Sequence, residues 1–136
     1  MLVTPLYAAL LTAWFLVLSA MVIRRRRQGI SLGDAGDPAM QRLIRGHANF
    51  AEYVPLALLL LALLELSRFS IYFLHALGIT LLVARVLHGY ALSFTRRWMF
   101  GRVWGAALTF LVLIVESVSC LYQSLQGHAL WLHGLL

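Results

Sequence analysis

The sequence predicts an all-α membrane protein, with four transmembrane helices in one up-down bundle. Of its 136 residues, 62% are hydrophobic and only 12% are charged, and the mean hydropathy is +0.85. A soluble domain of this length is far less apolar. The chain also contains four apolar runs separated by short polar connections, and a spanning helix needs about 20 mostly apolar residues. There is no room for a second domain, so residues 1–136 are expected to form a single one.

The first two helices have recognisable boundaries. Arg24 to Arg27 directly follow the first apolar run. A signal peptide carries its positive charge before the apolar segment, so the first run is expected to be a retained span. Asp37-Pro38 is a typical helix start, with Asp37 as the N-cap, and the second helix should begin there in the interface. The expected spans cover residues 4–23, 47–66, 71–92 and 103–125.

The distribution of arginine predicts the orientation. All eleven basic residues are arginine, and with five acidic residues they give a net charge of +6. Only Arg68 lies in the second connection. The others lie in or beside the first and third connections: Arg24, Arg25, Arg26, Arg27, Arg42, Arg45, Arg85, Arg96, Arg97 and Arg102. The positive-inside rule places those connections in the cytoplasm and both termini on the non-cytoplasmic side. The positive charge therefore indicates contact with membrane lipids, and no nucleic-acid partner is expected.

A polar stripe at the start of the second helix is the strongest candidate site. Arg42, Arg45, Asn49 and Glu52 are spaced i, i+3, i+7 and i+10, which places them on one helix face. Ionisable groups in a span normally face the bundle interior, a partner or a water-filled cavity. The residues alone fit a ligand site and an internal salt-bridge network equally well. No metal site is expected.

Three motifs resemble those of a known family. Arg45-Gly-His-Ala-Asn49-x-x-Glu52-Tyr-x-Pro55 resembles the signature of the MAPEG family, the membrane-associated proteins of eicosanoid and glutathione metabolism. Ala84-Arg85-Val-Leu-His88 and Arg102-Val-Trp-Gly105 agree with that family in position. The resemblance covers essentially the whole chain.

The resemblance implies a homotrimer that binds glutathione as cosubstrate between neighbouring subunits, in the cytoplasmic half. A lipophilic second substrate would arrive from the bilayer. Arg102 matches the arginine that stabilises the glutathione thiolate, and is the expected catalytic residue. The glutathione-binding residues expected by position are Arg24, Arg45, Asn49, Glu52, Arg85, His88 and Tyr90. Arg26 or Arg27 could align in place of Arg24.

One departure narrows the expected activity. Family members with eicosanoid chemistry carry a tyrosine one turn after the third-helix histidine, whereas this chain has Leu92, with Tyr90 nearby. This favours a bacterial-type member in the inner (plasma) membrane, with glutathione transferase or peroxidase activity on lipophilic electrophiles. The alternatives are a small oligomeric transporter and a non-catalytic membrane adaptor with the same fold.

The residue chemistry is consistent with glutathione. Arginine forks bind carboxylates through paired hydrogen bonds. Asn49 offers both a donor and an acceptor, and Glu52 could receive the glutamyl ammonium. A neighbouring cation and the positive end of a helix dipole both lower a thiol pKa, which fits Arg102 at the start of the fourth helix.

Other polar residues in the spans carry further expectations. Glu52 is the expected partner of Arg85. His47 should face another helix, and His88 is either a hydrogen bonder behind the site or a packing histidine. For Glu116 the choice between pairing with His75 and a protonated carboxyl bonded to a backbone carbonyl stays open.

Overall fold

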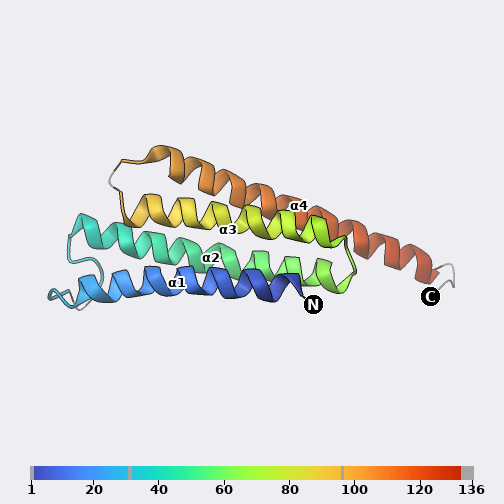
Figure 1. The fold of residues 1–136 in the computed structure, drawn as a ribbon, viewed down its shortest axis with the longest axis horizontal. Coiled ribbons are helices and arrows are strands. Elements are labelled where there is room, and N and C mark those ends of the chain that lie inside the picture. The colour runs from blue at the N-terminus through green and yellow to red at the C-terminus, as the bar shows by residue number, and fades with distance from the viewer. Residues whose placement is uncertain (1, 31, 96, 133–136) are drawn as a thin grey trace.

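The computed structural model describes residues 2–30, 32–95 and 97–132, with side chains up to residue 128. Arg96, one of the arginines used above for orientation, lies outside the described residues. Four α-helices follow one another in the described chain: α1 (Val3–Arg26), α2 (Pro38–Leu66), α3 (Ile71–Ser93) and α4 (Met99–Leu132). They run up and down in turn, so the α1–α2 and α3–α4 connections lie at one end and the start of α1 at the other (Figure 1). The predicted four-helix fold is confirmed.

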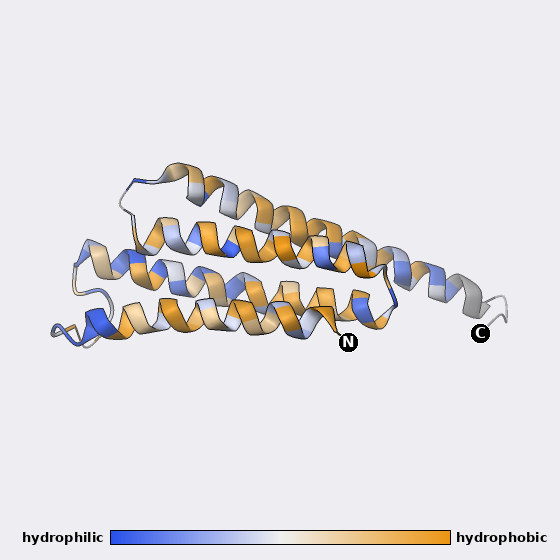
Figure 2. Cartoon of the chain, in the orientation of Figure 1, coloured by the Kyte–Doolittle hydropathy of each residue, from blue (hydrophilic) through white to orange (hydrophobic). Residues whose placement is uncertain are grey.

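All four helices are long and apolar enough to cross a membrane. Large apolar side chains are exposed along their outer faces, among them Leu56 and Leu59 of α2 and Ile114 and Val118 of α4. Hydrophilic residues gather at the end where α1 joins α2 (Figure 2). The bundle is therefore that of a polytopic membrane protein, and which end faces the cytoplasm stays a prediction.

Two helices extend beyond the expected spans. The last turn of α1 contains Arg24 to Arg26, because arginine is a good helix former and its charge interacts favourably with a helix C-terminus. Helix α4 continues to Leu132. In its C-terminal part, side chains one turn apart form hydrogen bonds. Gln126 donates to the Tyr122 hydroxyl at 2.9 Å, and such pairs support an exposed helix end.

The start of α2 agrees with the sequence prediction. Asp37 is the N-cap, and its Oδ1 accepts from the Ala39 amide at 2.9 Å. Its Oδ2 lies 2.7 Å from both Nε and Nη2 of Arg25, at the end of α1. This contact, reinforced by the Ala39 amide, holds the pKa of Asp37 below its ordinary value. The carboxylate therefore both caps α2 and ties it to α1.

Helix α3 is central and packs against the other three helices. In the C-terminal half of α3, glycines of α2 and α4 allow those two helices to approach α3 closely. A Cβ on Gly105 of α4 would lie 2.8 Å from the His88 amide nitrogen, and one on Gly46 of α2 would lie 2.7 Å from the Ser93 hydroxyl. Both distances are too short for a side chain, so these two glycines let α2 and α4 close on α3.

A carboxylate at the opposite end joins α2 to α1. Glu65, in the last turn of α2, accepts hydrogen bonds from the amides of Val3 at 2.9 Å and Thr4 at 2.8 Å, and from that of Leu2. The first amides of a helix have no partner within the helix, and a carboxylate there also interacts favourably with the helix dipole. Glu65 therefore caps α1 from another helix.

Replacing Glu65 with glutamine should lower the melting temperature of the detergent-solubilised protein. Glutamine keeps one acceptor oxygen and loses the charge, so about 2 kcal/mol of stability should be lost. Arg68→Gln is the matched control, because it removes a charge from an exposed side chain at the same end of the bundle without a described side-chain hydrogen bond. Equal melting temperatures for the two variants would show that the Glu65 cap does not stabilise the bundle.

Candidate functional site: a cationic cavity between three helices

A cavity of about 370 Å³ opens between α2, α3 and α4, at the end of the bundle that holds the arginine-rich connections. It is lined by Gln41, Arg42, Arg45, Asn49, His88, Leu92 and Arg102. The polar stripe thus faces a cavity over three of its four positions. None of the lining residues is acidic, so the cavity suits an anionic ligand.

Arg85 lies directly behind this cavity and is 1% exposed. Its Nη2 donates to Asn49 Oδ1 at 2.7 Å, and its Nη1 donates to Thr109 Oγ1 at 3.2 Å. The guanidinium carbon also lies 5.8 Å from the ring centre of Phe50 and 6.0 Å from that of Tyr53. The buried charge is thus held by neutral groups and aromatic faces.

The expected Arg85–Glu52 pair is wrong. Glu52, one turn beyond Asn49, is exposed. The Arg85 guanidinium instead donates a hydrogen bond to Asn49. The Asn49 side chain is nearer to Arg85 because α2 turns its buried face, which includes Phe50 and Val54, toward the bundle interior. Glu52 is therefore exposed and does not line the cavity of its own protomer.

His88 connects α3 to the start of α4. Its Nδ1 lies 3.0 Å from the Arg102 carbonyl oxygen. A carbonyl can only accept, so Nδ1 carries a proton and donates it. The Arg102 guanidinium lines the cavity from the first turn of α4, and its Nη1 lies 4.0 Å from Met99 Sδ. No described carboxylate neutralises it.

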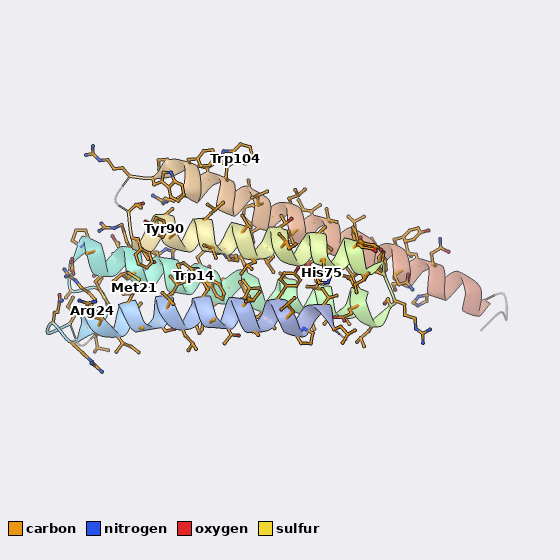
Figure 3. All side chains as sticks on the ribbon, viewed as in Figure 1. Trp14, Met21, Arg24, His75, Tyr90 and Trp104 are labelled. Atoms are coloured by element: carbon orange, nitrogen blue, oxygen red, sulfur yellow. The ribbon has the colours of Figure 1, made fainter. Side chains whose placement is uncertain are left out.

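The structure does not bring three expected residues to this cavity. Glu52 is exposed, Arg24 lines a separate cavity at the end of α1, and Tyr90 stacks on Phe94 with ring centres 5.0 Å apart. Figure 3 shows Tyr90 near Trp14 and Arg24 near Met21, both at the arginine-rich end. In one protomer, the cavity therefore combines Arg45, Asn49, His88 and Arg102, with Arg85 behind them, and leaves out these three.

Two histidines pack between helices. His47 Nε2 lies 3.1 Å from Ser19 Oγ, and its ring lies 4.6 Å from that of Phe15, so the prediction that it faces another helix is confirmed. His75 Nδ1 lies 2.9 Å from the Tyr7 hydroxyl. The hypothesis that His75 pairs with Glu116 is wrong, because neither carboxylate oxygen of Glu116 has a hydrogen-bond partner among the described residues.

Glu116 is fully buried in α4. Neither of its carboxylate oxygens has a hydrogen-bond partner within the described part of the chain. The alternative of a carboxyl bonded to a backbone carbonyl is therefore not found either.

Sequence reasoning did not name Gln41 or Thr109, and it did not place Leu92 in the cavity wall. Gln41 lies one turn before Arg45 on the same helix face, so the helical period could have found it. Thr109 lies one turn after Gly105, and its hydroxyl donates to the Gly105 carbonyl at 2.7 Å. Leu92 was noted as a departure from the family pattern, and it forms part of the cavity wall.

The described residues contain no cluster of three or more histidine, cysteine, aspartate or glutamate side chains that could hold a metal ion. The chemistry available in the cavity is that of guanidinium, amide and imidazole groups. Such groups bind carboxylates and stabilise a developing anion.

The fold and the cavity define a small four-span membrane protein with a cationic cavity between its helices. The sequence profile of the MAPEG family matches residues 4–122, and the chain belongs to the MAPEG family. It is 32% identical over 121 residues to the inner membrane protein YecN of Escherichia coli K12, covering 88% of this chain and 91% of the relative. YecN of E. coli O6:H1 matches equally. No solved structure matches.

Proposed function

We propose that this protein binds glutathione in the cationic cavity and activates its thiol for reaction with lipophilic electrophiles. One observation carries the proposal: Arg42, Arg45 and Arg102 converge on one cavity without an acidic lining residue. Family membership supports it, because the family is named for glutathione metabolism. The name of the relative YecN specifies a location in the inner membrane, and we propose the same location here.

The side chains suit the charges of glutathione, which carries two carboxylates, one ammonium and one thiol. Arg42 and Arg45 can each bind a carboxylate through two parallel hydrogen bonds. The Oδ1 of Asn49 is already occupied by Arg85 at 2.7 Å. Its NH₂ group is therefore left to donate to a carboxylate or peptide carbonyl of the ligand.

Arg102 is the proposed catalytic residue. A free thiol has a pKa of about 8.5, which an adjacent cation lowers. Arg102 supplies a guanidinium at the positive end of α4. The thiolate sulfur would attack the electrophilic carbon of the second substrate, forming a C–S bond as the leaving group departs with its electron pair. With a hydroperoxide, two glutathione molecules would become the disulfide while the peroxide becomes an alcohol and water.

A neighbouring subunit would complete the site. Glu52 is exposed within an apolar helix, and a carboxylate is costly beside lipid. We propose a homotrimer in which another subunit covers Glu52 and brings it to the ammonium of glutathione. Leu92 in the cavity wall supplies no hydroxyl donor, which favours transferase or peroxidase chemistry over eicosanoid synthesis.

Replacing Arg45 with glutamine should weaken glutathione binding at least tenfold in isothermal titration calorimetry of the detergent-solubilised protein. A charge-assisted hydrogen bond contributes about 1.5–3 kcal/mol, and each 1.4 kcal/mol changes the dissociation constant about tenfold. Arg68→Gln is the matched control, because Arg68 lies in the α2–α3 connection at the other end of the bundle. The absence of binding heat for the unmodified protein at millimolar glutathione would contradict the proposed function.

A further inference from the structure

His88 presents one ring nitrogen to the cationic cavity. Its Nδ1 donates to the Arg102 carbonyl oxygen at 3.0 Å, so the neutral ring carries its proton there and keeps a lone pair on Nε2. Nε2 has no hydrogen-bond partner in the described part of the chain, yet it is not among the fully buried unpaired polar atoms of those residues. His88 also lines the cavity. The lone pair of Nε2 is therefore open to a ligand in the cavity.

The packing of α4 against α3 holds the imidazole in this orientation. A Cβ on Gly105 of α4 would lie 2.7 Å from the His88 Cβ and 2.8 Å from its amide nitrogen. This close approach brings the Arg102 carbonyl, in the first turn of α4, to Nδ1. A hydrogen bond at one ring nitrogen of histidine determines the role of the other. The contact with α4 therefore leaves Nε2 as the nitrogen that can act as a base.

The surrounding charges fit a neutral ring before a ligand binds. Arg85 lies one turn earlier on α3, and Arg102 lies on α4. Two further arginines, Arg42 and Arg45, line the cavity from α2. A second proton would place an imidazolium among these guanidiniums, and like charges disfavour one another. None of the residues described around the cavity is acidic, so nothing in the lining would offset that charge.

Nε2 is also the one proton-accepting base among the residues that the structure describes around the cavity. The guanidinium groups only donate hydrogen bonds. Gln41 and Asn49 carry amides, which accept hydrogen bonds but do not take up protons at neutral pH, and Leu92 has no polar side-chain atom. A thiol that ionises in this cavity must give its proton to an acceptor, and the lining provides Nε2 of His88.

We propose that Nε2 of His88 accepts the thiol proton of bound glutathione, as the general base of the reaction. This inference rests on the proposed function. The S–H bond breaks, its electron pair stays on the sulfur, and an N–H bond forms at Nε2. The thiolate and the imidazolium form together, so the transfer leaves the net charge of the site unchanged, and Arg102 stabilises the sulfur. The ring then releases the proton to water, or to the departing leaving group when a second substrate is present.

The test measures how fast the thiolate forms, by stopped-flow ultraviolet absorbance after the detergent-solubilised protein is mixed with glutathione at neutral pH. His88→Asn is the main variant, because its amide can still donate to the Arg102 carbonyl from near the position of Nδ1 but has no basic nitrogen. Thiolate formation should become about a hundredfold slower, which is the low end of the contribution of a positioned base. The final thiolate absorbance and the calorimetric dissociation constant should stay close to those of the unmodified protein.

A base in the buffer should replace the missing imidazole. Added imidazole should accelerate thiolate formation in His88→Asn in proportion to its concentration, and should leave the unmodified protein unaffected. His75→Asn is the matched control, since His75 lies near the other end of α3 (Figure 3) and its Nδ1 also has a partner, the Tyr7 hydroxyl at 2.9 Å. This variant should form thiolate at the unmodified rate. If His88→Asn does not fold, His88→Gln provides a second variant without a base.

Three results would overturn this inference and leave the proposed function in place. The first is thiolate formation at the unmodified rate in His88→Asn and His88→Gln. The second is a slower rate that imidazole does not raise, which would give His88 a purely positioning role. The third is equal slowing by His75→Asn, which would indicate a general effect on α3. If the unmodified protein does not bind glutathione at all, both the inference and the proposed function are wrong.

Discussion

Replacing Arg102 with glutamine should abolish the ultraviolet absorbance of the glutathione thiolate in the bound complex at neutral pH. Without the guanidinium, the thiol should return toward its ordinary pKa of about 8.5 and remain mostly protonated. The effect should be large because Arg102 has no described carboxylate partner that would already have reduced its charge. Transfer activity toward a lipophilic electrophile should fall with the thiolate signal.

The pH dependence distinguishes thiolate stabilisation from binding alone. In the Arg102→Gln complex, raising the pH above the ordinary thiol pKa should restore the thiolate signal, because deprotonation then needs no cation. Arg42→Gln is the matched control, since Arg42 lines the same cavity but is assigned to a carboxylate; it should weaken binding and leave the thiolate pKa of the bound fraction unchanged. A thiolate signal unaffected by Arg102→Gln would favour a non-catalytic adaptor.

The helices and part of the cavity wall could be predicted from the sequence because both depend on local residue spacing. Composition and the arginine runs define the spans, and the 3.6-residue period places Arg42, Arg45 and Asn49 on one face. These three residues line the cavity, whereas Glu52, the fourth residue of the predicted stripe, does not. Asp37-Pro38 likewise defined the start of α2. These are local properties, and local spacing is enough to predict them.

The pairings between helices could not be predicted in the same way. Glu52 was the expected partner of Arg85 because opposite charges attract, but the rotation of α2 gives that place to Asn49. The same limitation applies to His75, which bonds Tyr7 instead of Glu116. The rotation of one helix against another depends on close contacts such as that of Gly105 with His88. The Gly101-x-x-x-Gly105 spacing permits this contact but does not specify its partner.

Replacing Arg85 with methionine should separate stability from ligand binding. Arg85 is 1% exposed, its Nε has no hydrogen-bond partner in the described part of the chain, and its other described partners are neutral. Burying a charge without a counter-ion is costly, and an apolar side chain of similar shape is often tolerated or even stabilising at such a position. We therefore expect an unchanged or higher melting temperature for Arg85→Met in detergent.

Glutathione binding by Arg85→Met should nevertheless fall by at least about tenfold, in line with the loss of one interaction with a charged group. The substitution removes a positive charge behind the cavity, and it releases Asn49 Oδ1 from the bond that directs the amide group toward the ligand. Arg85→Lys is the informative comparison, because lysine keeps the charge but cannot contact Asn49 and Thr109 through one planar fork. A variant that melts much earlier than the unmodified protein would show that Arg85 holds the helices together. Undiminished binding by Arg85→Met would show that the residue is not part of the site.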